Sequence, residues 1–229
     1  MRAGRMRRDR SRIGRRVGLD CDLGGHRELG DPHCGRESEH GRRRTILRIN
    51  ALGTVRVNEA FFSLAKEGFA IVNVASMAAH VFPSLLILTW RFNDALRNED
   101  RFMAKLTAAC NIMPNRVRPG FAYAISKNFV TWYTASQAAR FGSRGPRLVS
   151  VSPGSIDTDM GMLEERAGQE RWWELAALKR FGRPEEVAEV LAFCASTKAG
   201  YLTGVDIPCD GGVLAGFRLK DMLTVASDA

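Results

Sequence analysis

The chain lacks any apolar run long enough to cross a membrane, and this absence excludes the simplest class of membrane protein. Its longest nearly apolar stretch, VFPSLLILTW at residues 81–90, is about half of the roughly 20 residues that a spanning helix needs. The N-terminal arginines are followed by no apolar stretch, so they do not resemble a secretory signal, and Asp9, Asp20 and Asp22 argue against an organelle transit peptide. We therefore expect a cytoplasmic protein with no membrane partner.

Cysteine is scarce, with five residues at irregular spacing in a chain of 229. An odd number of cysteines in so long a chain is not typical of a disulfide scaffold, so we expect reduced thiols. Two cysteines and three histidines fall in the N-terminal segment, but their spacing fits no pattern that places closely spaced donors around a tetrahedral ion. These residues are Cys21, His26, His33, Cys34 and His40. The sequence thus predicts no metal site.

The excess of positive charge belongs to residues 1–44. This segment holds 13 arginines, seven acidic residues and eight glycines, with almost no apolar periodicity, whereas the formal net charge of the whole chain is +9. Such a composition predicts a disordered segment. No aromatic residues are interleaved with the arginines, as single-stranded nucleic acid would require, so we expect no nucleic-acid partner. A basic RNA-binding module is the alternative interpretation.

From residue 45 onwards the pattern is that of an α/β domain. Short apolar runs rich in β-branched residues predict buried strands, and stretches of helical periodicity separate them. The expected strands cover residues 69–76, 146–154 and 204–212, and the expected helices cover 46–64, 92–110, 122–142, 170–182 and 183–196. Alternation of this kind predicts a parallel sheet with helices on both faces.

Tyr123 and Lys127 form the first chemically suggestive pair. They stand four residues apart in an expected helix, which places them on one face within reach of a common ligand. Taken alone, the pair is better explained as a half-buried tyrosine beside a solvated lysine. However, one expected strand ends in Ser76 and the next ends in Pro153 and Gly154. Ligands of open parallel sheets bind beyond the carboxyl ends of the strands, so these features should converge.

Six segments resemble, in order, the conserved motifs of the short-chain dehydrogenase/reductase family. They are INALG, NVASMAAH, YAISK, VSPGSIDTDM, GRPEEVAEVLAFCAS and LTGVDIPCDGG, spread over residues 45–215. The resemblance implies a Rossmann-type doubly wound parallel sheet and a nicotinamide-dependent oxidoreductase that interconverts an alcohol and a ketone or aldehyde. The long stretch at 77–120 resembles the helical insertion of the bacterial 3α-hydroxysteroid dehydrogenase/carbonyl reductase subgroup, which implies a hydrophobic carbonyl compound as substrate.

The resemblance also assigns catalytic roles to four residues. Tyr123 would be the general acid and base, and Lys127 would lower the pKa of the phenol and bind the hydroxyls of the nicotinamide ribose. A phenol with an ordinary pKa of about 10 is a poor base at neutral pH, and a nearby ammonium group stabilises its phenolate. Ser76 would steady the substrate oxygen, and Asn50 would complete a water-linked proton relay. The alternatives are that Ser76 caps a turn and that Asn50 is a helix N-cap.

A loop after the second strand is the expected cofactor contact. By the resemblance, Pro153 and Gly154 present backbone groups to NAD or NADP, and Ile156 and Thr158 lie beside the carboxamide; a simple turn is the alternative. Farther along, four large apolar residues lie where the family places a mobile substrate lid, and core packing is the competing interpretation. They are Met160, Met162, Trp172 and Trp173.

The glycine-rich N-terminal motif of the family is missing. No TGxxxGxG turn, whose backbone amides would receive the cofactor pyrophosphate, and no NNAG-type strand end precede INALG. We therefore expect a partial Rossmann sheet over residues 45–229 that lacks the N-terminal βαβ units. A truncated or misread gene start, with residues 1–44 not native, explains this best, because composition and apolar periodicity change abruptly at residue 45. The alternative is a catalytically inactive remnant that acts as an interaction protein, for example by forming a homo-oligomer with copies of itself.

Overall fold

The computed structural model describes residues 41–64, 66–82, 87, 89–158, 172, 175–218 and 221. Within these ranges the chain forms a three-stranded parallel sheet in the order β1-β2-β3. Its strands are β1 (Ala70–Val74), β2 (Arg147–Pro153) and β3 (Asp206–Cys209). The predicted α/β class with a parallel sheet is confirmed.

The register of the sheet aligns the carboxyl ends of the strands. Val72 pairs with Val149, and Val151 pairs with Ile207. Val149 and Val151 are fully buried, as expected for the central strand of a parallel sheet covered on both faces. The loops that follow the strands therefore leave from one edge of the sheet.

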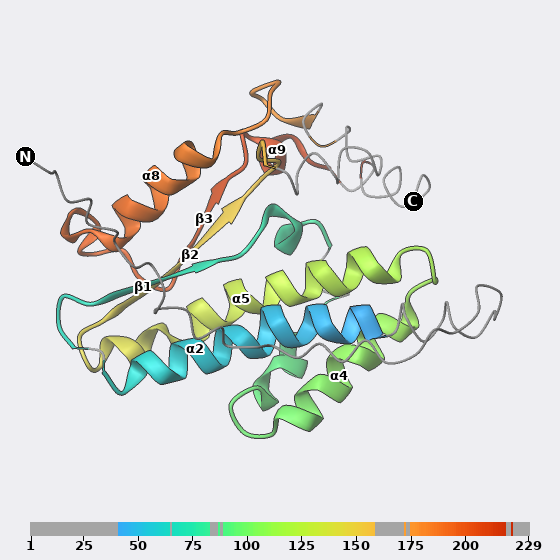
Figure 1. Cartoon of the computed structure of the whole chain (residues 1–229), viewed down its shortest axis with the longest axis horizontal. Coiled ribbons are helices and arrows are strands. Elements are labelled where there is room, and N and C mark those ends of the chain that lie inside the picture. The colour runs from blue at the N-terminus through green and yellow to red at the C-terminus, as the bar shows by residue number, and fades with distance from the viewer. Residues whose placement is uncertain are drawn as a thin grey trace, which may run out of the picture.

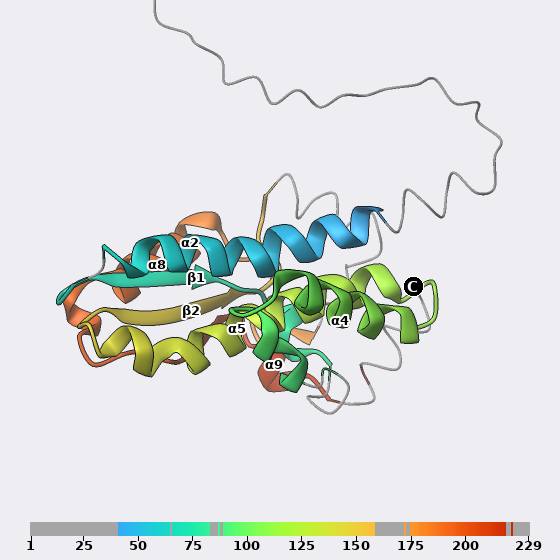
Figure 2. The same ribbon diagram turned by 90° about the horizontal axis from the view of Figure 1, so that it is seen from below.

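Helices cover both faces of the sheet (Figure 1). On one face, α8 (Pro184–Ala195) packs through Cys194 onto Val149 and Val151. On the other face lie α2 (Gly53–Phe62), α4 (Glu99–Ile112) and α5 (Arg118–Gly142). Seen from below, α5 runs along β2 (Figure 2), and α2 is joined to β1 by a 2.9 Å hydrogen bond from Asn58 to Asn73. Among the described residues, no helix is both long and apolar enough to cross a membrane.

The main hydrophobic core lies around α5. Phe129 is fully buried, and its ring packs at 4.8 to 5.9 Å, centre to centre, against four aromatic neighbours. These neighbours are Phe92, Phe102, Trp132 and Tyr133. Burial of each such side chain stabilises the fold by about 1.5–3 kcal/mol. This core holds α5 in place and therefore fixes the helix that carries Tyr123 and Lys127.

The helix before β1 starts earlier than expected and contains a wider turn. Residues 41–47 are helical, so the helix crosses the predicted domain boundary at residue 44, while residues 1–40 lie outside the described part of the chain. A π-helical turn, η1 (Arg48–Leu52), then joins directly to α2. Such turns often occur at functional sites, and this one contains Asn50.

The predicted helix at 92–110 is in fact two elements. A 3-10 helix, η3 (Thr89–Asp94), comes first, and α4 begins anew after Asn98. The side chain of Asn98 accepts a 2.8 Å hydrogen bond from the amide of Arg101, which is a good N-cap. The helical periodicity was continuous in the sequence, but this cap restarts the helix.

The prediction of a helix over residues 170–182 is wrong for its described second half, because residues 176–178 form bends and 179–181 are not helical. Leu178 donates its amide to Gly211, and Gly182 donates its amide to Ser155. The backbone here bonds to distant segments instead of to its own preceding turn. By contrast, α8 begins as predicted, with Pro184 in its first turn and the carboxylate of Glu186 accepting from the amide of Arg183 at 2.8 Å.

Three short elements complete the described structure. They are the 3-10 turns η2 (Met77–His80) and η5 (Thr197–Ala199), and the short helix α9 (Val213–Gly216). Of these, η2 follows β1 directly and packs against α5. The end of β1 is thus held close to α5.

A polar network lies on the face of the sheet that α5 covers. The Asp206 carboxylate accepts hydrogen bonds from Ser150 at 2.6 Å, from Ser152 at 2.7 Å and from Nε2 of His80 at 2.8 Å. Burial raises the pKa of Asp206, but these hydrogen bonds outweigh burial and hold the pKa below its ordinary value. The charged carboxylate is therefore part of the folded structure.

Gly145, between α5 and β2, is predicted to be essential for stability. Its φ is +99°, and an added Cβ would lie 2.7 Å from Cα of Glu67. Gly145→Ala should lower the free energy of unfolding in urea by about 1–3 kcal/mol, through backbone strain and overpacking. Gly142→Ala is the matched control, because no atom lies within 4 Å of its added Cβ. Equal stability of the two variants would contradict this account.

Asp206 should make the fold sensitive to acid. Its pKa is lower in the folded than in the unfolded chain, so its hydrogen bonds stabilise the fold above the unfolded value of about 3.9, and this stabilisation is lost as pH falls through the lower folded pKa. Asp206→Asn should lower the free energy of unfolding at pH 7 by about 1–3 kcal/mol and flatten its decline between about pH 5 and pH 2.

The matched control for Asp206→Asn is Glu189→Gln, which removes one negative charge from an exposed position of α8. Urea unfolding at a series of pH values measures both variants. An Asp206→Asn curve parallel to that of the wild type would show that the network does not hold the carboxylate in its charged form.

Candidate active site

Tyr123 and Lys127 lie on α5 beside the end of β1. The Lys127 ammonium lies 5.8 Å from the centre of the Tyr123 ring and donates a 3.1 Å hydrogen bond to the carbonyl of Val74. Burial lowers the pKa of Lys127, because a low-dielectric environment disfavours the charged form. The ammonium group is therefore partly removed from water and held by the backbone. The helix thus holds the ammonium group close to the half-buried Tyr123 ring and to the last residue of β1.

Ser76 lies two residues beyond Val74, at the start of η2. Its backbone is extended, and its hydroxyl oxygen accepts a 3.2 Å hydrogen bond from the amide of Ala78. The alternative that Ser76 caps a turn is thus confirmed. A hydroxyl group that accepts one hydrogen bond still carries its own proton, so this cap orients the side chain and leaves a donor available.

Asn50 connects to the Tyr123 turn through a residue that was not expected from the sequence. Its side-chain amide donates to the hydroxyl of Ser126 at 3.0 Å, and this hydroxyl donates to the backbone carbonyl of Tyr123 at 2.7 Å. Asn50 lies inside η1, where the Thr54 hydroxyl donates to its carbonyl at 2.7 Å. The alternative that Asn50 is a helix N-cap is therefore wrong, because helical residues precede it.

The predicted cofactor loop continues from β2. The Gly154 amide donates to the carbonyl of Cys209 at 3.0 Å, and a Cβ on Gly154 would lie 2.6 Å from Cα of Asp210. Only glycine fits this close approach. Ile156 forms a parallel bridge with Gly182, and Thr158 lies at the exposed end of the described loop. The loop is therefore more than a simple turn, since it is tied to β3 at Gly154 and to Gly182 at Ile156.

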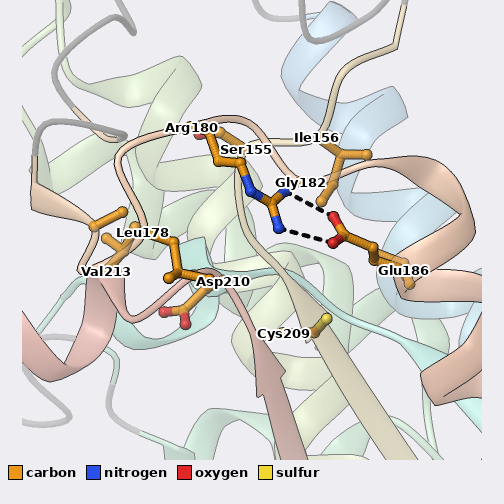
Figure 3. Close-up of a pocket in the computed structure, with 12 residues that line it drawn as sticks. Ser155, Ile156, Leu178, Arg180, Gly182, Glu186, Cys209, Asp210 and Val213 are labelled. Atoms are coloured by element: carbon orange, nitrogen blue, oxygen red, sulfur yellow. Dashed lines mark hydrogen bonds and ion pairs between the residues drawn. The ribbon is translucent and has the colours of Figure 1, made fainter.

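A small pocket lies beyond the carboxyl ends of β2 and β3 (Figure 3). Ser155 and Ile156 line one part of it, and Cys209 lies at its floor. Across it, Arg180 donates two 2.8 Å hydrogen bonds to the Glu186 carboxylate, which lower the pKa of Glu186 to about 2. The pocket has a volume of about 160 Å³, well below the roughly 300 Å³ at which small-molecule sites begin. The pocket alone cannot hold a dinucleotide.

The described residues fit the nicotinamide end of such a cofactor better than its phosphates. Lys127 and the Gly154 loop are the groups expected at that end, and both adjoin the same edge of the sheet. A glycine pair does lead from β3 into α9, but the amides of Gly212 and Leu214 already donate to the Asp210 carboxylate. A phosphate at this position would meet a negative charge. No glycine-rich phosphate cradle is thus formed by the described part of the chain.

Several polar residues near the site were not identified from the sequence. They are His80, Ser126, Asn128, Ser150, Ser152 and Asp206. The one signal available for them was an acidic residue inside a short apolar strand, since Asp206 stands between Val205 and Ile207. Serine and histidine at turns carry no comparable signal, because they occur there for many local reasons.

Trp172 is the one residue of the proposed lid that the structure describes; Met160, Met162 and Trp173 lie outside the described residues. It is partly buried against the small core cluster of Met77 and Val213, and its ring stacks on Phe217 at 5.7 Å. This packing supports core packing at residue 172. The residues of the rejected zinc pattern, all before residue 41, also lie outside, and the described residues hold no cluster of metal ligands.

Two comparisons of the sequence agree on a family. Residues 104–214 match the family model of enoyl-(acyl carrier protein) reductase. A 3-alpha-hydroxysteroid dehydrogenase/carbonyl reductase of Comamonas testosteroni is 32% identical over 182 residues, which cover 76% of this chain and 67% of the relative. An uncharacterized short-chain type dehydrogenase/reductase of Sinorhizobium fredii is 31% identical over 199 residues, or 80% of this chain and 35% of the relative. The chain thus spans about a third to two thirds of these relatives.

Solved structures support the same fold. A mutant short-chain dehydrogenase/reductase of Serratia marcescens superposes with a TM-score of 0.53 at 24% identity, over 73% of this chain and 54% of that structure. A short-chain dehydrogenase family protein of Francisella tularensis gives a TM-score of 0.52 at 24% identity, over 74% and 60%. The sheet described above is therefore part of a larger fold in these proteins. The sequence relatives, and the Comamonas testosteroni enzyme above all, show that the chain belongs to the short-chain dehydrogenase/reductase family.

Proposed function

We propose that this chain acts in an NAD(P)-dependent oxidoreductase that interconverts an alcohol and a ketone or aldehyde. The observation that carries the proposal is the position of the Lys127 ammonium, beside the Tyr123 ring and hydrogen-bonded to the last residue of β1. This position supports an acid/base role for the pair, because ligands of parallel sheets bind beyond the carboxyl ends of the strands. Family membership supports the same class of reaction.

Tyr123 is the proposed proton donor and acceptor at the substrate oxygen. NAD(P), when bound, supplies or takes the hydride at the carbon. A phenol needs help to act as a base near neutral pH, and a positive charge close to it favours the phenolate. Because Lys127 is partly buried, its charge acts more strongly on the ring than a fully solvated ammonium would.

Ser76 and Asn50 have supporting roles in this proposal. The amide of Ala78 orients the Ser76 hydroxyl, so that its proton can be donated to the substrate oxygen. Asn50, through Ser126, stabilises the backbone turn of α5 that carries Tyr123. The proposed water relay through Asn50 would extend this link.

The loop from Pro153 to Thr158 is the proposed contact for the carboxamide, with Pro153, Gly154, Ile156 and Thr158 as its members. The hydrogen bond from Gly154 to Cys209 keeps the start of this loop against β3. NAD and NADP both fit this end, because they differ only at the adenosine ribose, which is remote from the nicotinamide.

A hydrophobic carbonyl compound, such as a hydroxysteroid, is the proposed substrate class. An apolar cluster adjoins the Ser76 turn, where Met77 is buried against Val213 and partly buried Trp172 and Leu214 pack beside them. The name of the Comamonas testosteroni relative, a 3-alpha-hydroxysteroid dehydrogenase/carbonyl reductase, supports the same class. The predicted helical insertion over residues 77–120 is also consistent with that subgroup.

An inactive interaction protein is the second candidate function. Four apolar side chains along η1 and α2 and in the turn after α2 are 44% to 70% exposed: Ile49, Val57, Phe61 and Leu64. Apolar patches of this kind often mark contacts with another chain or a second copy. The absence of a phosphate cradle from the described residues supports this candidate too. Cofactor binding distinguishes the two functions.

Tyr123→Phe should abolish turnover and leave cofactor binding intact. Loss of a general acid/base lowers kcat by about 10²- to 10⁴-fold, whereas titration with NADH or NADPH, followed by tryptophan fluorescence, should saturate as in the wild type. Tyr201→Phe is the matched control, because Tyr201 is fully exposed. If the wild type itself shows no saturable change with either nucleotide, the interaction protein becomes the better account.

Lys127→Met should lower activity and change how stability depends on pH. Burial lowers the folded pKa of Lys127, so holding the ammonium charged costs stability below that pKa, and the cost falls as pH rises from the folded pKa towards the unfolded value of about 10.4. Lys127→Met should therefore lower kcat by about 10²-fold or more and remove this alkaline contribution to the free energy of urea unfolding. Lys198→Met, at an exposed site, should change neither. A Lys127→Met variant with the pH dependence of the wild type would contradict the argument.

A further inference from the structure

The turn that carries Ser76 is too short to hold itself in place. η2 has four residues, and within it the amide of Ala79 donates to the carbonyl of Ser76 at 2.9 Å while the amide of Ala78 donates to the Ser76 hydroxyl at 3.2 Å. Short 3-10 turns have poor hydrogen-bond geometry and few bonds to repay the ordering of their backbone. The position of Ser76 therefore depends on contacts made by the rest of the turn.

Two side-chain contacts anchor the far end of η2. Asn128, the residue after Lys127 on α5, donates from its amide to the carbonyl of Ala79 at 2.8 Å. His80 reaches across to β3, where its Nε2 lies 2.8 Å from Oδ2 of Asp206. A carboxylate only accepts, so Nε2 carries the proton of this hydrogen bond. One anchor ties the turn to the helix of Tyr123, and the other ties it to the sheet.

The acceptor of the His80 anchor is itself held rigidly. Ser150 and Ser152 are fully buried on β2, and both donate to the Asp206 carboxylate. The side chain of Asp206 is only 12% exposed. Burying a carboxylate is costly unless several donors satisfy it. Pairing of β3 with β2 does not require a buried carboxylate. The Asp206 network therefore has a role beyond strand pairing.

The cluster is not a hydrolytic triad, although it contains serine, histidine and aspartate. Nε2 of His80 faces both Asp206, at 2.8 Å, and Ser152, at 3.4 Å, and the Ser152 hydroxyl already donates to Asp206. In a triad the aspartate holds one ring nitrogen and the serine donates to the other. Here the serine is committed to the carboxylate, so no nucleophile is activated.

We propose that His80 is a positioning residue, which fixes Ser76 by tying η2 to Asp206 on β3. The inference rests on the proposed function, because it gives His80 a part in the reaction through Ser76. It requires no contact of His80 with substrate or cofactor. Loss of the imidazole should loosen η2 and let the Ser76 hydroxyl drift from its place, and misplacement of a reacting group lowers turnover more than it lowers binding.

The first test is residue-resolved amide hydrogen exchange by NMR, which needs no activity. In His80→Ala, the amides of Ala78 and Ala79 should exchange at least about ten-fold faster than in the wild type. His80→Gln should restore most of the protection, since its Nε2 offers a donor near the same position. Unchanged exchange in His80→Ala would overturn the proposal.

Ser150→Ala is the matched control within the same network. It removes one donor to Asp206 but does not touch η2, so it should lower the melting temperature without speeding exchange at Ala78 and Ala79. Equal exchange in Ser150→Ala and His80→Ala would mean general loosening and would overturn the positioning role. If His80→Ala fails to fold, His80→Gln is compared with Asp206→Ala, because only the second removes the acceptor. Exchange at Ala78 and Ala79 should then be faster in Asp206→Ala, and equal exchange in the two variants would overturn the proposal.

The second test is kinetic and separates this inference from the proposed function. His80→Ala should lower kcat about ten-fold, while the KM for NADH or NADPH stays within two-fold of the wild type. His80→Gln should recover most of the wild-type kcat. A raised KM with unchanged kcat would overturn the role in positioning Ser76. If the wild type reduces no carbonyl compound, the proposed function fails, whereas the exchange measurement still decides whether His80 anchors the turn.

Discussion

The hydrogen bond from the Lys127 ammonium to the carbonyl of Val74 joins the long helix α5 to the end of β1, and the candidate site depends on this junction. The backbone groups of a strand alternate in direction, and the amide of Ala75 donates to β2, so the carbonyl of Val74 points away from β2 and is free to accept. An ammonium that is partly removed from water is stabilised by such an acceptor. The same contact therefore satisfies the charge and places it beside Tyr123.

The elements that could be predicted from the sequence are those determined by local pattern. The apolar runs of β1 and β2, and the start of α8 at Pro184, depend on neighbouring residues alone, and all three were predicted within a few positions. The pairing of Tyr123 with Lys127 was predictable for the same reason, since helical spacing fixes it. The family resemblance then supplied the order of the remaining parts.

What could not be predicted depends on contacts between distant segments. The bends at residues 176–178 exist because Leu178 bonds to Gly211 across the chain, although the local periodicity is helical. Ser126 enters the site only because Asn50, 76 residues earlier, donates to it. His80 and Asp206 are 126 residues apart. Helical or strand periodicity carries no information about such partners, because each depends on how complete elements pack.

Polar pairs on the buried face of the sheet determine how the surrounding elements sit on it. Asn73 of β1 shares hydrogen bonds with Asn58 of α2 and donates to Thr134 of α5, while Asp206 holds η2 through His80. Apolar contacts alone would allow small sliding movements, but each of these bonds is lost by a shift of about 1 Å, because hydrogen bonds tolerate little change in length. The proton-transfer groups of the candidate site, which lie on α5 and η2, thus take their positions from side chains that do no chemistry. Binding of the cofactor phosphates is a separate requirement, since the Gly212 and Leu214 amides that could serve it are already occupied by Asp210.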